Sequence, residues 1–221
     1  TGHLLQRLSQ FIIQTHQGTM KLIRLFLTLA WISIFGSGLF AQAPDLELNL
    51  RYNTTLSRYE VYARPTATQP TFNWGPSQIS VVTPASVTDA PFNVTSVAAG
   101  AWLDNSNIYA PTVDPSHDFH GIGSLGAPIS FTANVEKLIF HFTLSGGGCV
   151  PGLRLYINGS DPDSGAPGMF GGDFSNTVFA IVPGVPGGYE SYINNYNNTG
   201  TSCNLPPTAV DDLITTPEDT P

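Results

Sequence analysis

The chain is poor in charged residues and in cysteine, and it lacks any long helical pattern. Only 11% of its 221 residues are charged, with 8 Lys and Arg against 16 Asp and Glu, a formal net charge of −8. An acidic chain repels the phosphates of nucleic acids, so we expect no nucleic-acid partner. The 22 Gly and 18 Pro are too many helix breakers for a helical bundle, and 41% hydrophobic residues are too many for a disordered chain.

Motifs of three common enzyme classes are also absent from the sequence, namely GxxxxGK[ST], HExxH and GxSxG. A GxGxxG pattern does occur at residues 121–126. A dinucleotide site requires a strand before this pattern and a helix after it, whereas here HDFH precedes and an Ala-Pro pair with a β-type run follows. We therefore predict that the protein is not an enzyme, and we assign no catalytic or cofactor-binding residue.

The N-terminal region has the order of a secretory signal peptide. The first methionine is Met20, and the positive residues Lys21 and Arg24 precede an apolar segment at 25–35. Gly36, Ser37 and Gly38 then end the apolar segment, and Ala41 offers a small residue for cleavage. A positive segment, an apolar segment and a small residue before the cleavage site define such peptides, so we expect an N-terminal signal helix.

We predict a signal peptide at 20–41, cleaved after Ala41, and an upstream extension at 1–19 that is not native. The alternative is a retained membrane anchor, because residues 25–44 contain no charge and could cross a bilayer. With the signal removed we expect no stable membrane span. The expected location is secreted, either extracellular or on the outer cell surface.

Removing residues 1–41 makes the chain more acidic, because five Lys and Arg then face all 16 acids, a net charge of −11. Ca²⁺ prefers oxygen ligands, so such carboxylates could bind it. The alternative is that the charge only keeps the protein soluble.

Alternation of apolar and polar residues with a period of two dominates the rest of the chain and predicts strands. The clearest runs are 46–52, 58–64 and 137–144, with further strands expected at 78–82, 92–97, 153–157, 177–182 and 189–193. Polar turn residues between the first two runs predict a hairpin. Short strands separated by breakers indicate an all-β fold, an antiparallel β-sandwich over residues 44–204.

Cys149 and Cys203 are 54 positions apart, and both lie in the predicted exported part. In an oxidising compartment two cysteines most simply form one disulfide, which on the chain-entropy model stabilises by roughly 4 kcal/mol. The alternative is two separate buried thiols.

A cluster of histidines and acids occurs in DPSHDFHG, where His117 and His120 stand near Asp114 and Asp118. These residue types can bind Zn²⁺, but a structural zinc site has four ligands, and no third His or Cys stands at motif spacing. We therefore interpret the segment as a solvated loop. His141 alternates with phenylalanines and is expected on the outer face of a sheet.

Two further groups could bind ligands. Asp161 and Asp163 follow a predicted strand and could direct oxygens to one Ca²⁺, or could simply form Asx turns. Trp74 and Trp102 could stack on sugar rings as a ligand platform, or could fill the inner faces of the sandwich.

The C-terminal segment PPTAVDDLITTPEDTP resembles the opening of a bacterial cadherin-like or related tandem Ig-like repeat. We assign residues 205–221 to a linker and the start of such a repeat, which is truncated here. The resemblance implies an extracellular, often calcium-dependent β-sandwich repeat of large adhesins. It places four acids near an interdomain Ca²⁺ site: Asp211, Asp212, Glu218 and Asp219.

The sequences FNWGPSQISVVTP, GGGCVPGLRLYINGSDPDSGAPGMFGGDFSN and YESYINNY resemble an N-terminal domain of secreted surface proteins from Bacteroidota-type bacteria. In pattern the sandwich is similar to cohesin, carbohydrate-binding-module and Ig-like folds. The resemblance implies a domain that precedes repeat arrays, and it supplies no catalytic residues.

From these features we expect a non-catalytic extracellular binding or adhesion module at the head of a multidomain bacterial surface protein, with Ca²⁺ as a stabilising ion. Its partner would be an extracellular polysaccharide or a surface protein. The alternative is a carbohydrate-binding module of a secreted polysaccharide-degrading enzyme. A third hypothesis is an enzyme in its own right.

Overall fold

The structure is a computed structural model, and it describes residues 44–181 and 188–203. The predicted extension at 1–19, the signal peptide at 20–41 and the acids of the cadherin-like segment lie outside these residues.

Strands are the only regular elements in the part of the chain that the structure describes. They are β1 (Leu46–Asn53), β2 (Arg58–Pro65), β3 (Gln69–Pro84), β4 (Asn93–Ser96), β5 (Leu103–Ile108), β6 (His117–Ser124), β7 (Pro128–Phe131), β8 (Lys137–Thr143), β9 (Arg154–Leu155), β10 (Thr177–Ala180), β11 (Tyr189–Glu190) and β12 (Tyr192–Asn195). The predicted all-β fold is confirmed.

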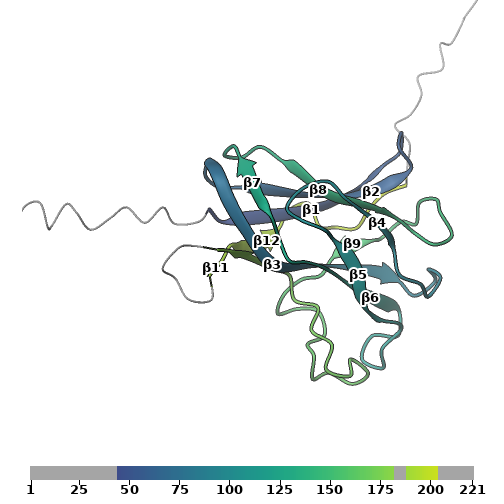
Figure 1. Ribbon diagram of the computed structural model, residues 1–221. Coiled ribbons are helices and arrows are strands. Elements are labelled where there is room, and N and C mark those ends of the chain that lie inside the picture. Colours follow the sequence, from purple (N-terminus) through teal and green to yellow (C-terminus); the bar gives the residue numbers. More distant parts are fainter. Residues whose placement is uncertain (1–43, 182–187, 204–221) are drawn as a thin grey trace, which may run out of the picture. The chain divides into compact units, whose positions relative to one another are not determined.

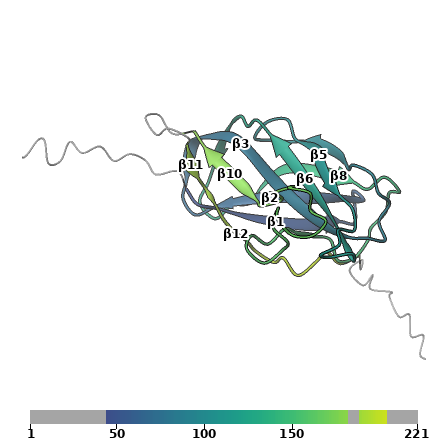
Figure 2. The same ribbon diagram turned by 90° about the horizontal axis from the view of Figure 1, so that it is seen from below.

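The strands form two sheets that pack face to face (Figures 1 and 2). The five-stranded sheet has the order β12-β1-β2-β8-β4, antiparallel except where β12 runs parallel to β1. The seven-stranded sheet has the order β11-β10-β3-β6-β5, and the long strand β3 also pairs with β7 and β9. The predicted antiparallel sandwich and the β1–β2 hairpin are therefore both confirmed.

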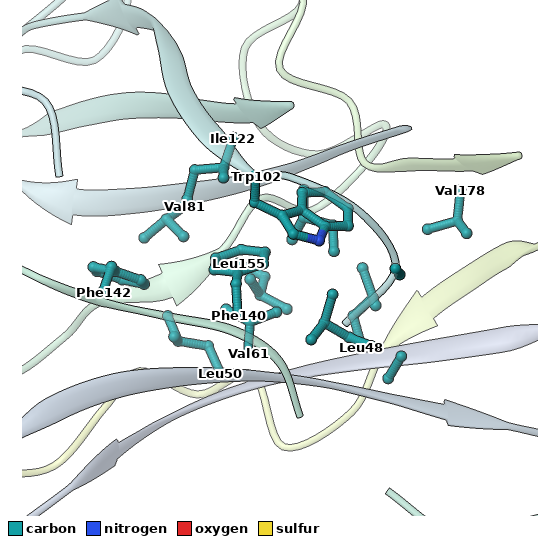
Figure 3. Packing of buried hydrophobic residues seen from close by; sticks show 14 of the residues in the cluster. Leu48, Leu50, Val61, Val81, Trp102, Ile122, Phe140, Phe142, Leu155 and Val178 are labelled. Carbon is teal, nitrogen blue, oxygen red and sulfur yellow. The ribbon is translucent and has the colours of Figure 1, made fainter. Parts of the chain in front are cut away.

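The main core lies between the two sheets. Figure 3 shows the Trp102 ring between Val81 and Ile122 of the seven-stranded sheet and the side chains of Val61 and Phe140 of the other sheet. Each of these four neighbours is fully buried. Apolar side chains at alternate positions of both sheets thus supply the burial that stabilises the sandwich.

A β-bulge changes the predicted alternation in β8. Val61 pairs with Phe140, but the next residue, Tyr62, pairs with Leu138, so Ile139 is the extra residue. Ile139 is consequently fully buried while Leu138 is only half-buried, the reverse of what strict alternation predicts. His141 lies half-buried opposite Glu60, and it does not join the core cluster that contains Phe140 and Phe142.

Most of the segment predicted as a solvated histidine loop, from His117 onward, belongs instead to the strand β6, which pairs with β3 on one side and β5 on the other. Asp114 lies in the loop before this strand, where its carboxylate contacts His117 Nδ1. Asp118 and His120 are each 1% exposed. The prediction was wrong because β6 gains a strand partner on each side and the Phe92 ring stacks on His120, and the polar sequence itself signals neither contact.

Cys149 and Cys203 form a disulfide with a Cα–Cα distance of 5.6 Å, as predicted. The cross-link joins the segment after β8 to the segment after β12.

Candidate binding groove

The outer face of the seven-stranded sheet carries three successive rows of cross-strand neighbours, each with its central residue on β6. The first row is Val82–Phe119–Ile108, the second is Ser80–Gly121–Ser106, and the third is Gln78–Gly123–Leu103. Residues that pair directly across strands point to the same face of a sheet. The three rows therefore differ mainly in their central side chain, which is a phenyl ring in the first and a hydrogen in the other two.

A long loop between β9 and β10, residues 158–176, covers the first row. Met169 and Phe174 of this loop form a second hydrophobic cluster with Val82, Phe119 and the nearby Tyr156. Every member of the cluster is at most 2% exposed. The loop therefore has a hydrophobic core of its own, separate from the main core of the sandwich.

Hydrogen bonds close this loop at its base. Asn158 Nδ2 donates to Asn176 O, and Asn176 N donates back to Asn158 Oδ1, at 2.9 and 2.8 Å. The buried Asn176 side chain also accepts from Ser80 N at 2.7 Å and donates to Tyr156 O at 2.7 Å. We call residues 158–176 the Ω-loop, because they form a longer segment than the usual loops of that name but like them have ends that lie close together and are packed by their own side chains.

The Ω-loop is also supported from the side. Val113, in the loop between β5 and β6, donates its N–H to Pro167 O at 2.8 Å, and the two loops lie together in Figure 1. Arg154 donates to both carboxylate oxygens of Asp161 at 2.6 Å. Such a bidentate pair fixes orientation as well as charge.

The third row remains open and forms the floor of a groove of about 540 Å³. The groove is lined by Pro76, Ser77, Gln78, Ala101, Leu103, Asn105, Gly123, Ser124, Leu125 and Gly126. Gly123 supplies no side chain between its neighbours Gln78 and Leu103, so the surface is hollowed there. A volume of this size falls in the range of ordinary ligand sites.

Leu103 and Leu125 supply exposed apolar surface in the groove. Leu103 is 63% exposed and Leu125 is 85% exposed. The turn that carries Leu125 is fixed by Gly126, at φ +84°, because a Cβ there would collide with the Trp74 carbonyl oxygen. The backbone therefore holds Leu125 in an exposed position that its apolar character alone does not favour.

Two amides supply the polar side of the groove. Asn105 is the extra residue of a bulge between Asp104 and Ser106, which directs its side chain toward Gly123, and no described residue hydrogen-bonds that amide. Gln78 stands at the boundary with the Ω-loop, where its Nε2 donates to Asp173 O at 2.8 Å. The Ω-loop thus forms one end of the groove.

The lining of this groove indicates what kind of ligand it can hold. Its lining offers amides, hydroxyls, backbone groups and aliphatic side chains, and contains no titratable side chain. The arrangement can hold an uncharged ligand with both polar and apolar faces.

The titratable side chains closest in sequence to the groove lining are those of Asp104, Asp118 and His120. They are buried on the inner face of the same sheet and do not face the groove. His120 Nδ1 lies 2.9 Å from Asp104 Oδ2, and both side chains are at most 1% exposed. Burial raises the pKa of the nearby Asp118 carboxyl, although the Ala110 N–H donates to it. With so little exposure these groups cannot reach a ligand, and they act as structural groups at the end of the sandwich.

The interpretation of Trp74 and Trp102 as a ligand platform is wrong. Both side chains are 1% exposed, and their rings pack edge to face with centroids 5.9 Å apart in the main core. The alternative drawn from the sequence, that they fill the inner faces, is what the structure shows. The indole groups are satisfied internally, since Trp74 donates to Ser77 Oγ and Trp102 to Ala98 O.

Asp161 and Asp163 support the Ω-loop. Both Asp161 oxygens already bind Arg154, and Asp163 Oδ1 accepts from Gly165 N at 2.9 Å in an Asx turn. Among residues 44–181 and 188–203, no three His, Cys, Asp or Glu side chains gather as a metal site would require. The acids of the cadherin-like segment, Asp211, Asp212, Glu218 and Asp219, lie outside the described residues.

Sequence reasoning missed the groove, although one signal was present. The glycines of residues 121–126 match a nucleotide-binding pattern, which is the only role considered for them from the sequence. Glycines two positions apart in a strand, however, also leave two gaps on the same face of the sheet. The bulge at Asn105 and the turn at Gly126 have no comparable signal in the sequence.

No helix in the described ranges is long and apolar enough to cross a membrane. Comparison of the chain with known proteins gives no match to a family model, to a curated protein or to a solved structure.

Proposed function

We propose that this protein is a non-catalytic extracellular binding module, located at the head of a multidomain bacterial surface protein, and that its ligand occupies the groove over Gly123. The single observation that carries the proposal is the chemistry of that groove, which combines exposed leucines with amides and has no titratable side chain. The signal-like segment at 20–41 and the cadherin-like segment at 205–221 support the extracellular location.

The ligand of the proposed module is an extracellular polysaccharide or a surface protein. Charged ligands are disfavoured because the lining contains no side chain of opposite charge to pair with them. The amides of Gln78 and Asn105 specifically favour a second candidate function, a carbohydrate-binding module of a polysaccharide-degrading enzyme. The two functions differ in the downstream domains, which would be repeats in the first and a hydrolase in the second.

The proposed Ca²⁺ belongs to the cadherin-like segment. Asp161 does not fit as a ligand, because its two oxygens are already bound by a guanidinium group. We expect chelation by EDTA to lower the melting temperature of a chain extended through its first complete repeat. An unchanged melting temperature would show that the segment does not use calcium.

The groove can be filled without disturbing the fold. Gly123 has no positive φ, and the atom nearest to a Cβ built there is Asn105 Oδ1, at 3.5 Å. Gly123→Phe should therefore fold normally while occupying the space of a ligand. Thr95→Phe is the matched control, since it adds the same ring to an exposed strand position of the other sheet.

Binding of both variants is measured on immobilised neutral polysaccharides and on purified mucin and collagen. We expect Gly123→Phe to abolish the binding seen with the wild-type chain and Thr95→Phe to retain it. Equal binding by the two variants would place the ligand elsewhere. Equal melting temperatures of both variants and the wild type are the check on folding.

A further inference from the structure

The Ω-loop exposes one aromatic ring in an unusual way. Phe170 is 93% exposed, the most exposed large hydrophobic side chain in the described ranges, while the adjacent Met169 is fully buried in the second cluster. A large exposed aromatic ring gains nothing from folding. Its position therefore needs an explanation outside the packing of this domain.

The loop holds this ring in a defined place. Gly171 N donates to Ser164 O at 3.1 Å, and Gly172 N donates to Met169 O at 2.8 Å. Gly172 packs directly against Ile108 of β5, where a Cβ would come within 2.7 Å of Ile108 Cδ1. The ring is consequently presented from an ordered turn, which lowers the entropy cost of binding.

The backbone at this position is strained. Phe170 has φ +50°, a left-handed conformation that is costly for a bulky residue. Gly168 and Gly171 of the same loop also adopt positive φ, and there the sequence supplies glycine. Glycine at position 170 would relieve the strain and would lose almost no buried apolar surface, so the phenylalanine lowers stability through its backbone and contributes little through burial. Strain of this kind collects at functional sites.

We propose that Phe170 is a stacking subsite for a sugar ring of a neutral polysaccharide. One face of a pyranose presents C–H groups that suit the electron-rich face of a phenyl ring. Its hydroxyl groups can hydrogen-bond to polar side chains, and the same loop contains Asp163, Ser164 and Asp173. The subsite rests on the proposed function and specifies its ligand class.

The surroundings of the ring favour this ligand over others. The Ω-loop contains three Asp and no Lys or Arg, so anionic polysaccharides and anionic lipid surfaces are repelled. A stable protein interface buries about 1,200–2,000 Å² around a central apolar group of residues. Phe170 is a single ring among polar and glycine residues, which matches one sugar ring and not a protein pocket.

The test uses the full chain in native gels that contain xylan, laminarin, pullulan or galactomannan. Five proteins are compared: wild type, Phe170→Trp, Phe170→Leu, Phe170→Gly and Gly123→Phe. At least one polysaccharide should retard the wild type and Phe170→Trp. Phe170→Leu and Phe170→Gly should bind about tenfold more weakly, since a stacked ring contributes on the order of one decade in affinity.

A melting curve separates this role from a structural one. Phe170→Gly should melt at a higher temperature than the wild type while losing affinity. Equal affinity of Phe170→Leu and wild type would overturn the proposal, as would the absence of retardation in all four gels. If only Gly123→Phe lost affinity, the groove would stand and the stacking subsite would fall. If only the Phe170 variants lost affinity, the stacking subsite would stand and the groove would not be the binding site.

Discussion

The two ends of strand β6 share one sheet face and differ in what covers it. At Phe119 the face lies under the Ω-loop and its hydrophobic cluster, whereas at Gly123 it is open to solvent. Burial of a phenyl ring stabilises the fold and exposure does not, so Phe119 contributes to stability only because the Ω-loop covers it. A glycine leaves no apolar side chain to bury, so the same face can stay open and form a groove.

The disulfide encloses the cover of one end of β6 and none of the residues that line the groove at the other end. The Ω-loop, residues 158–176, lies inside the segment that the Cys149–Cys203 disulfide closes, and every residue lining the groove lies outside it. We therefore expect substitutions of buried residues at the covered end to lower stability, and substitutions at the open end to change binding with little effect on stability.

Loss of the disulfide should have the largest effect. Replacing both Cys149 and Cys203 by Ala should lower the free energy of unfolding by roughly 4 kcal/mol, because the unfolded chain is no longer closed over 54 positions. Urea unfolding of the wild type with and without reductant gives an independent measure. A loss below about 1 kcal/mol would mean that the covered end does not depend on the cross-link.

Removing the main anchor of the cover should be next in size. Met169→Ala should cost about 3 kcal/mol, since the side chain is fully buried and its loss leaves a cavity beside Phe119. The adjacent Phe170→Ala is the matched control and should not destabilise the chain, because that ring is exposed. The free energies of unfolding of the two variants are measured in urea. Similar losses in both would contradict the role of Met169 as the buried anchor of the Ω-loop.

The base of the Ω-loop should contribute somewhat less. Asn176→Ala removes the acceptor of Ser80 N and one donor to Tyr156 O, and should cost about 2 kcal/mol. Asn105→Ala changes the same residue type at the open end and should stay within about 0.5 kcal/mol of the wild type. Hydrogen exchange at the Ser80 amide should rise only in Asn176→Ala. Slow exchange there in both variants would refute the role of Asn176.

The sequence predicts the alternating strands well and the covered end poorly. The runs at 46–52 and 58–64 became β1 and β2, because each has one apolar and one polar face. Strand β6 was missed because its face toward the main core carries Asp118 and His120, and its other face carries two glycines. Its pairing with β3 and β5 and its cover by the Ω-loop and Phe92 come from distant parts of the chain, which no local pattern encodes.

The aromatic residues show the same limit. Trp74 and Trp102 were expected either in the core or on a platform, and composition alone cannot separate the two. The structure buries both and exposes Phe170, which no periodic pattern distinguishes from Phe174 four positions later. The difference arises from the backbone turn at Gly168–Gly171, a tertiary feature of the Ω-loop.

Ionisation provides a smaller test of the covered end. Burial, together with the charges of Asp161, Asp173 and Asp163, raises the pKa of Tyr156 from 10.0 to about 12. The neutral hydroxyl donates to Pro162 O at 2.9 Å, so Tyr156→Phe should cost about 1 kcal/mol at pH 8.

The folded state holds the Tyr156 proton more tightly than the unfolded state does. This stabilisation is complete below pH 10 and is lost as pH rises toward 12. The advantage of the wild type over Tyr156→Phe should therefore shrink between pH 10 and 11.5 in urea unfolding. A constant difference across that range would show that folding does not raise the pKa of Tyr156.

The smallest expected effects separate the two glycines of the open end. A Cβ at Gly123 meets no atom closer than 3.5 Å, whereas a Cβ at Gly121 would lie 3.1 Å from both Gln78 Oε1 and Ser106 Cβ. Gly123→Ala should therefore stabilise by about 0.5 kcal/mol, because alanine restricts the unfolded chain and fits the strand. Gly121→Ala should give no such gain, since Gln78 must move and its bond to Asp173 O weakens. Equal changes in urea unfolding for both variants would mean that Gln78 does not mark the boundary between the covered and open ends.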